Sequence, residues 1–271
     1  MRLLRGCSAI LTALCLLVPV SAGSDTAVVP ILMYHHFTLD PTCANGNCIT
    51  ADALEEQLAA LSRAGYHGVT VADCISFVDS GTPLPDKPIL LTADDGYRSV
   101  LDIALPMMDR YGFPLSAAVI GSHIDADTDG IPHFTIDEAE NDPHGARLEL
   151  TSHTYALHDP DGRGVTADIA SLPGDISRMR GLDGAENTQI GRVFVYPFGK
   201  WTAESETVLR AAGYRATLAI LSGKNRVAVL RIGDAESLYH MPRIAVDGST
   251  GGAELIRILE RECEKAVVER G

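Results

Sequence analysis

Residues 88–97 constrain the fold of this chain more than any other part of its sequence. An apolar run over residues 88–93, Pro-Ile-Leu-Leu-Thr-Ala, ends abruptly in Asp94, Asp95 and Gly96. A short apolar run bounded by turn residues is typical of a strand that is buried on both faces, as in a parallel sheet. Two carboxylates at the mouth of such a strand repel each other and lose hydration, so a cation, an arginine or a shared proton must lie nearby. A helix cap is the alternative interpretation of the same pair.

Strand and helix patterns alternate along most of the remaining chain, which predicts a parallel sheet. About seven strand–helix units in a chain of 271 residues favour a closed barrel over an open sheet. The polar clusters of the sequence follow strands, at the end where such barrels carry their chemistry. Residues 125–145 are acidic and poorly patterned, and we expect a long loop there with room for one helical turn. The expected strands cover residues 28–37, 67–71, 88–93, 115–120, 147–152, 193–195, 216–221 and 239–246, and the expected helices cover 51–64 (capped by Thr50), 72–78, 99–111, part of 166–182, 203–212 and 253–268.

The first 22 residues predict a segment outside this fold. A basic start is followed by an apolar run over residues 9–20, which is too short to span a bilayer, and by small residues at 20–22. This is the pattern of a signal peptide, so we expect residues 23–271 to form a single exported domain, periplasmic or secreted, with no membrane span. The formal net charge of −14 argues against nucleic acid or an anionic lipid surface as partner. The sequence indicates nothing about protein partners.

The cysteines suggest one short-range disulfide. Cys43 and Cys48 flank a turn-rich tetrapeptide, and in an oxidising compartment we expect them to form a bridge. Cys74 and Cys263 lie on apolar helical faces, which is more typical of buried thiols than of metal ligands. Whether these two pair with each other is left open.

Two further polar clusters follow expected strands. His35 and His36 end the first strand, and His153 and His158 follow the strand over residues 147–152. Two imidazoles and a carboxylate form a set that can hold a metal and leave positions open for water and substrate. His153 and His158 are five residues apart and cannot lie on one face of a helix or strand, so their loop must fold back if they share a target. Core packing for the first pair, and surface or capping roles for the second, are the alternatives.

Four segments of the sequence resemble polysaccharide deacetylases of the NodB-homology type, which form carbohydrate esterase family 4. They are Val-Pro-Ile-Leu-Met-Tyr-His at 29–35, Leu-Thr-Ala-Asp-Asp-Gly-Tyr at 91–97, Ser-His-Thr-Tyr-Ala-Leu-His at 152–158 and Tyr-Pro-Phe-Gly at 196–199. The resemblance implies an α/β fold, a distorted (β/α) barrel in one domain, which we expect to be seven-stranded. It also implies metal-dependent removal of N- or O-acetyl groups.

The resemblance implies a role for each matching residue. Asp94 corresponds to the general base and Phe198 to the residue whose backbone N–H helps to hold the oxyanion. The implied cofactor is one divalent cation, with zinc first and nickel or cobalt as alternatives. The implied ligands of this cation are Asp95, His153 and His158.

Departures from the common family pattern point to one branch of it. Val195 replaces the usual arginine, the two histidines are five residues apart instead of four, and no C-terminal Leu-x-His motif is present. These features resemble the exported deacetylases of poly-β-1,6-N-acetylglucosamine, in which the histidine of an N-terminal Tyr-His motif is the general acid. That histidine corresponds to His35. We hypothesise that Arg243 supplies the positive charge that Val195 cannot.

The expected function is removal of N-acetyl groups from an extracellular N-acetylglucosamine polymer, with the β-1,6-linked polymer first. Tyr97, Tyr155 and Trp201 adjoin the motifs and are candidates for stacking on sugar rings, with packing at the barrel mouth as the alternative. Tyr196 is a further candidate substrate contact. The alternatives are an O-acetyl esterase, a deacetylase of chitin or peptidoglycan, and a catalytically inactive carbohydrate-binding barrel. A glycosidase fits less well, because its two carboxylates must be at least about 5 Å apart.

Overall fold

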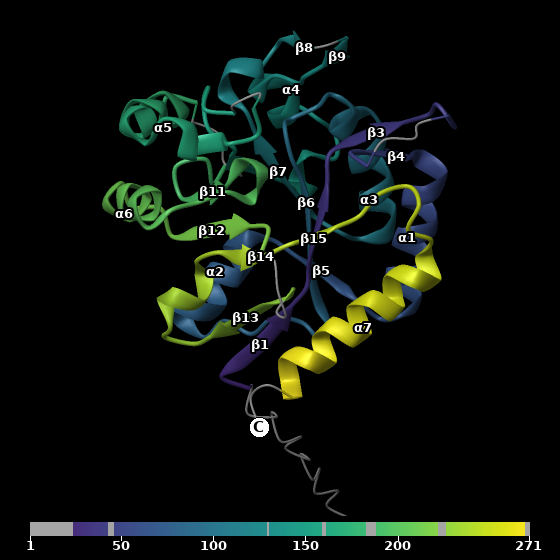
Figure 1. Cartoon of the computed structure of the whole chain (residues 1–271). Helices are drawn as coiled ribbons and strands as arrows, with labels where there is room; N and C mark the ends of the chain where they lie inside the picture. Colours follow the sequence, from purple (N-terminus) through teal and green to yellow (C-terminus); the bar gives the residue numbers. More distant parts are fainter. Residues whose placement is uncertain are drawn as a thin grey trace, which may run out of the picture.

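A nearly closed barrel of parallel strands forms the centre of the molecule (Figure 1). The computed structural model describes residues 24–42, 46–128, 130–158, 161–182, 188–221 and 226–268. Within these ranges the strand order is β14-β12-β11-β10-β7-β6-β2-β15, and every neighbouring pair is parallel. The strands are β2 (Ile31–Tyr34), β6 (Pro88–Ala93), β7 (Leu115–Val119), β10 (Leu148–Ser152), β11 (Val193–Val195), β12 (Ala216–Ala219), β14 (Met241–Pro242) and β15 (Ile244–Ala245).

The last strand segment closes the barrel. β14 pairs with β12 and β15 pairs with β2, while only Arg243 separates β14 from β15 in the sequence. These eight short strands therefore fill seven positions, and the predicted (β/α) barrel is confirmed. A further strand, β5 (His67–Val69), lies beside the amino-terminal half of β6.

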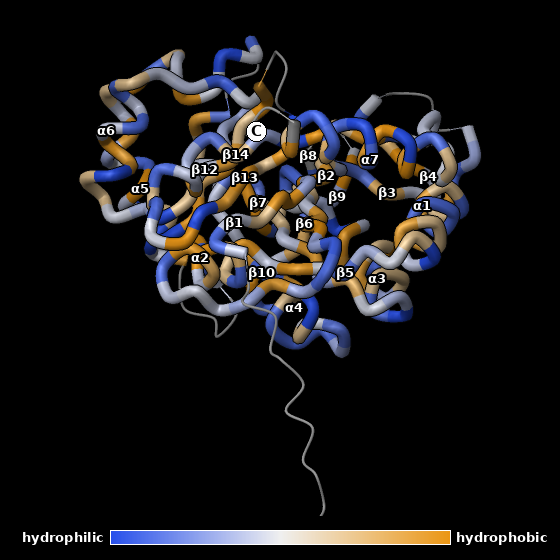
Figure 2. The backbone as a smooth tube through the Cα atoms, turned by 90° about the horizontal axis from the view of Figure 1, so that it is seen from below, coloured by the Kyte–Doolittle hydropathy of each residue, from blue (hydrophilic) through white to orange (hydrophobic). Residues whose placement is uncertain are grey.

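Alternation along the strands separates two apolar layers. In β6, Leu91 and Ala93 pack with the core residues of α1, α3 and α7, whereas Leu90 belongs to a different cluster, with residues of β11, β12 and α2. Thr92 and Asp94 are in phase with Leu90 because successive side chains of a strand point to opposite faces. Figure 2 shows hydrophobic residues concentrated in the central strands, with many hydrophilic residues along the outer helices and loops.

The helices follow the sequence pattern closely where that pattern is strong. α1 is capped by Thr50, whose hydroxyl accepts from the backbone N–H of Ala53 at 3.2 Å, as expected of a helix N-cap. Its leucine stripe, Leu54, Leu58 and Leu61, is fully buried. The helices are α1 (Ala51–Arg63), α2 (Val71–Ser80), α3 (Leu105–Tyr111), α4 (Ile136–Glu140), α5 (Leu172–Arg180), α6 (Ala203–Ala211) and α7 (Gly252–Val268).

The expected single strand over residues 28–37 is instead three strands. Pro30 interrupts it because proline has no backbone N–H for the ladder. β1 (Thr26–Val29) pairs with β13 (Ala228–Arg231), a strand that we did not predict, and this pairing is antiparallel. Beyond β2, β3 (His36–Thr38) pairs with β4 (Cys48–Thr50). The separation of β2 from β3 leaves His35 outside both strands, at the barrel rim.

Three other segments differ in detail from the sequence-based expectation. The helix expected over residues 99–111 begins with a π-helical turn, Val100–Ala104, before α3. In the segment expected to be partly helical, 166–182, α5 is preceded by two short 3-10 turns, Gly164–Ala167 and Ile169–Ser171, the first of which begins before the segment. The expected loop at 125–145 holds the hairpin of β8 (Asp127–Thr128) and β9 (Ile131–Pro132), followed by α4.

Some predictions concern residues that the structure does not describe. The expected signal peptide, residues 1–22, lies outside the described ranges, and so does Cys43. Cys48 takes part in a disulfide, but its pairing with Cys43 stays a prediction. Cys74 is a buried free thiol, as expected, and Cys263 is free and half-buried. Among the described helices, none combines the length and the apolar character needed to cross a membrane.

Candidate active site

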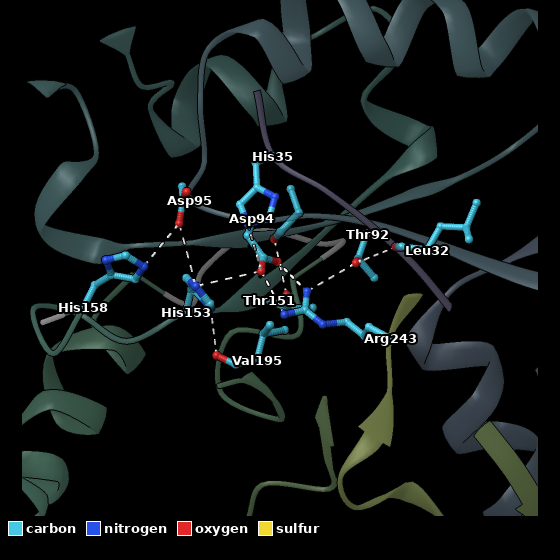
Figure 3. A network of polar contacts seen from close by, with 11 residues as sticks. Leu32, His35, Thr92, Asp94, Asp95, Thr151, His153, His158, Val195 and Arg243 are labelled. Carbon is cyan, nitrogen blue, oxygen red and sulfur yellow. Dashed lines mark hydrogen bonds and ion pairs between the residues drawn. The ribbon is translucent and has the colours of Figure 1, made fainter. Parts of the chain in front are cut away.

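The polar clusters that follow separate strands meet at one rim of the barrel (Figure 3). His35 follows β2, and the pair Asp94 and Asp95 follows β6. His153 and His158 follow β10, while Arg243 enters from the closing strand segment. They converge because the carboxyl ends of parallel strands lie at the same edge of a barrel.

Asp95, His153 and His158 form a set of three candidate metal ligands. One ligand atom from each lies within 4.8 Å of the other two. Oδ1 of Asp95 is 3.7 Å from Nε2 of His153 and 3.6 Å from Nε2 of His158. That oxygen is buried and has no hydrogen-bond partner among the described residues. Because an unpartnered buried carboxylate oxygen is costly, the arrangement fits a divalent cation between the carboxylate and the two imidazoles.

The ring of His153 is oriented for such a cation. Its Nδ1 lies 2.8 Å from the carbonyl oxygen of Val195, and because a carbonyl only accepts, Nδ1 carries the proton. The lone pair of Nε2 is then free to face Asp95, as in metal sites where a second hydrogen bond fixes the imidazole. Burial lowers the pKa of His153 to about 3, which keeps the ring neutral.

The backbone at Asp95 is in an unusual conformation. Its φ is +76°, in the left-handed region that non-glycine residues rarely adopt, and Gly96 continues the turn at +80°. Such conformations cluster at functional sites, where the surrounding structure holds them. Burial raises the pKa of the Asp95 carboxyl to about 6. A bound cation would oppose this effect and favour the ionised carboxylate.

Asp94, unlike Asp95, is paired with a positively charged side chain. Arg243 donates to both of its carboxylate oxygens, Nη1 to Oδ1 at 2.6 Å and Nη2 to Oδ2 at 2.8 Å. Both residues are only 3% exposed. Burial by itself would raise the pKa of Asp94, but the Arg243 guanidinium holds it well below its usual range. The two adjacent acids therefore differ in protonation behaviour, an arrangement that often separates catalytic roles.

A third residue of β6 links this ion pair to the barrel. The Thr92 hydroxyl donates to the carbonyl oxygen of Leu32 at 2.8 Å and accepts a long contact from Nη1 of Arg243 at 3.4 Å. Arg243, which we hypothesised to supply the positive charge that Val195 cannot, thus contacts the carboxylate of Asp94; its role stays a hypothesis.

His35 lies beside the same carboxylate. Its Nε2 is 4.0 Å from Oδ2 of Asp94, and Nε2 of His153 is also 4.0 Å from that oxygen. The His35 side chain is 17% exposed. The neighbouring His36 faces elsewhere, with Nδ1 3.6 Å from Sγ of Cys48.

The candidate substrate contacts occupy different positions. Phe198, with φ of +56°, is 40% exposed, and its ring centroid is 4.5 Å from that of His158. Trp201 is 39% exposed and stacks on His240, with ring centroids 3.7 Å apart. Tyr196 is fully buried against Phe194, so a direct contact between Tyr196 and a substrate is not supported.

Two histidines near the site were missed by the sequence interpretation. His133 is 5% exposed, and its ring lies 4.8 Å from that of Tyr97 and 5.1 Å from that of His123. His133 belongs to the poorly patterned segment expected as a loop. No regular spacing marks it in the sequence, and only the hairpin of β8 and β9 brings it to Tyr97.

Comparison with known proteins gives consistent results. The family model described as "Polysaccharide deacetylase" matches residues 81–217, about half of the chain. A curated relative from Escherichia coli (strain K12), named poly-beta-1,6-N-acetyl-D-glucosamine N-deacetylase, is 26% identical over 234 residues, which cover 73% of this chain and 33% of the relative. The chain thus spans about a third of the length of the first curated relatives it matches.

Solved structures share the fold. The deacetylase PplD of Streptococcus pyogenes, solved in complex with acetate, has a TM-score of 0.68 and 17% identity, covering 85% of this chain and 97% of the other. IcaB from Ammonifex degensii has a TM-score of 0.67 and 22% identity, with coverage of 85% and 96%. At these identities the similarity establishes the fold alone.

Proposed function

Because the chain belongs to the polysaccharide deacetylase family, we propose that it is a metal-dependent enzyme that removes N-acetyl groups from an extracellular N-acetylglucosamine polymer. The observation that carries this proposal is the set of Asp95, His153 and His158 beside the ionised pair of Asp94 and Arg243. The preferred substrate is poly-β-1,6-N-acetylglucosamine, which the name of the Escherichia coli relative supports. We further propose that residues 1–22 direct export.

Asp95, His153 and His158 would hold one divalent cation, zinc in the first place, with nickel or cobalt as alternatives. When bound, this cation would polarise the acetamide carbonyl and lower the pKa of a water molecule toward neutrality. The neutral ring of His153 and its hydrogen bond to Val195 fix one ligand before the cation arrives.

Asp94 would act as the general base. Arg243 keeps its carboxylate ionised and holds both oxygens in a fixed orientation. A buried, ionised carboxylate at this position can accept a proton from the attacking water. The same guanidinium weakens the carboxylate as a base, so orientation and permanent ionisation are the advantages that Arg243 provides.

His35 would protonate the leaving amine. Its Nε2 lies 4.0 Å from Oδ2 of Asp94, and its side chain is 17% exposed. The backbone N–H of Phe198 would donate to the oxyanion that develops on the acetamide. Trp201, which is 39% exposed, would contact a sugar ring, since exposed aromatic faces suit the apolar faces of a pyranose. Tyr97 is partly buried between His36 and His133 and is a second, less accessible candidate for such a contact.

The decisive experiment is an acetate-release assay on β-1,6- and β-1,4-linked N-acetylglucosamine oligomers, with Asp94→Asn as the test variant. Loss of the base should lower kcat by roughly 10²–10⁴-fold. Asp102→Asn, an exposed aspartate on the π-helical turn, is the matched control and should retain wild-type activity. Activity of Asp94→Asn within a few-fold of wild type would reject Asp94 as the base.

The same assay separates the alternative functions. Release of acetate from an O-acetylated glycan, but not from the N-acetylated oligomers, would indicate an O-acetyl esterase. Preference for β-1,4-linked oligomers would indicate a deacetylase of chitin or peptidoglycan. Binding of the oligomers without release of acetate by the zinc-loaded protein would indicate an inactive carbohydrate-binding barrel.

A further inference from the structure

The segment between His153 and His158 must turn back on itself to bring both imidazoles to one carboxylate oxygen. The chain reverses at Thr154, whose φ is +74°. This left-handed conformation is unfavourable for threonine, because its side chain is branched at Cβ. The side chain of Thr154 also accepts from the backbone N–H of Leu157 at 3.2 Å. A strained loop of this kind keeps its shape only where neighbouring groups hold it.

Asp175 of α5 is the side chain that holds the middle of this loop. Its Oδ1 accepts from the backbone N–H of Tyr155 at 2.7 Å, and its Oδ2 accepts from that of Ala156 at 2.8 Å. The residue is 1% exposed. A buried carboxylate that receives two consecutive N–H groups fixes the direction of the peptide planes between them, because charged hydrogen bonds are short and directional.

Other contacts hold the same loop from both sides. On the side of β7, the N–H groups of Gly121 and Ser122 donate to the carbonyl oxygens of Thr154 and Tyr155 at 3.0 and 2.7 Å. On the side of α5, the guanidinium of Arg178 lies 4.4 Å from the ring centre of Tyr155. Among these contacts within the described residues, the Asp175 carboxylate is the acceptor of the N–H groups of Tyr155 and Ala156.

Residue 121 must be small for this arrangement. A Cβ atom at Gly121 would lie 2.5 Å from the Tyr155 ring and 2.8 Å from Sδ of Met179 on α5. The loop between His153 and His158 is therefore closely packed against Gly121, beyond the end of β7, and is hydrogen-bonded to Asp175 of α5.

We propose that Asp175 is a positioning residue for the candidate metal centre: by binding the N–H groups of Tyr155 and Ala156, it sets the loop that brings His158 to Asp95 opposite His153. This inference rests on the proposed metal site. In this proposal α5 sets the distance between His153 and His158, although it carries none of the candidate ligands. The five-residue spacing of the histidines is the reason that such a support is needed.

The test compares Asp175→Asn with Asp168→Asn in the metal-free full chain. Asp168 is an exposed aspartate that caps a 3-10 turn near α5 through Ser171 and does not touch the loop. Zinc affinity is measured by competition with a chromophoric chelator, and folding is measured by circular dichroism and thermal unfolding without metal. We expect Asp175→Asn to bind zinc about 10–100-fold more weakly than wild type, and Asp168→Asn to bind it with unchanged affinity.

The possible outcomes are distinct. If Asp175→Asn unfolds more easily but binds zinc as tightly as wild type, Asp175 is only a structural residue and the inference is rejected. If the wild-type chain itself binds no zinc, nickel or cobalt, the proposed metal function fails first and the inference with it. Should Asp175→Asn not fold, Asp175→Ser takes its place, because a serine hydroxyl cannot accept from the N–H groups of both Tyr155 and Ala156. Zinc affinity of the folded Asp175→Ser variant equal to that of wild type would also reject the inference.

Discussion

At the scale of single residues, two adjacent carboxylates differ because of what each one faces. The backbone turn at Asp95 points the two side chains to different partners. Asp94 meets a guanidinium and is held ionised, whereas Asp95 meets two imidazole nitrogens and its pKa is raised by burial. In our proposal the first acts on protons and the second on a cation.

Arg243→Ala tests the residue-scale argument. Since Arg243 holds the pKa of Asp94 down, its removal should raise that pKa, so the acidic limb of kcat/KM should shift to higher pH. The uncompensated buried carboxylate should also lower the free energy of unfolding by about 3–5 kcal/mol. Both are measurable, by pH–rate profiles and by urea unfolding.

The control for this variant is Arg215→Ala. Arg215 forms an ion pair with Asp79 in which both side chains are more than a third exposed, and such pairs contribute about 0–1 kcal/mol. An Arg243→Ala pH profile that coincides with that of wild type would remove Arg243 from the mechanism.

At the scale of elements, β10 precedes two of the candidate metal ligands and also carries a residue that caps α2. Beyond its end lie His153 and His158, while Glu149 near its start is 5% exposed and caps α2. The carboxylate of Glu149 accepts from the N–H groups of Val71 and Ala72, at 2.9 Å each, and from the Ser116 hydroxyl at 2.5 Å. A carboxylate at a helix N-terminus is favourable because it meets unpaired N–H groups and the positive end of the helix dipole.

Glu149→Ala should therefore destabilise the protein without altering the chemistry of the rim. Each buried N–H left without an acceptor costs about 1–3 kcal/mol, and urea unfolding at pH 7 measures the sum. Glu264→Ala, an exposed glutamate on α7, is the control and should change stability by less than about 0.5 kcal/mol. A value for Glu149→Ala as small as that of the control would show that α2 does not depend on this cap.

At the scale of the whole molecule, the segment that closes the barrel also brings Arg243 to the candidate active site. This segment consists of β14, which pairs with β12, then Arg243, and then β15, which pairs with β2. Arg243, between the two strands, is the residue that contacts Asp94. Asp94 and Arg243 are 149 residues apart in the sequence. Formation of the ion pair thus requires the chain to be folded nearly from end to end.

Metal binding should stabilise this whole unit. A ligand that binds only the folded state at 100 times its Kd adds about 2.7 kcal/mol, which for a domain of this size raises Tm by roughly 5–10 °C. Differential scanning fluorimetry with zinc, and with EDTA, measures the shift. His158→Ala should lose most of it, whereas His67→Ala, an exposed histidine on β5, should keep it. Equal Tm values for wild type with zinc and with EDTA would contradict the metal site.

Local patterns in the sequence were sufficient for much of the fold. The run before Asp94 predicted β6, Thr50 and the leucine stripe predicted α1, and the alternation of elements predicted the barrel, because each of these signals depends on neighbouring residues. The spacing of His153 and His158 also predicted that their loop folds back. Residue types and their places after strands indicated a site of two imidazoles and a carboxylate, and the resemblance to the family implied that Asp95, His153 and His158 are the ligands.

The tertiary structure decided what depends on contacts between distant segments. It brought Arg243 to Asp94, paired β1 with the unpredicted β13, turned His133 toward Tyr97 and placed Asp175 under the histidine loop. No local pattern encodes these contacts, because they arise from the register and closure of the barrel. Asp94 and Asp95 illustrate this difference. The sequence by itself determined that two adjacent buried carboxylates need a positive partner. Only the closed barrel decided that Asp94 meets Arg243 while Asp95 faces the imidazoles of His153 and His158.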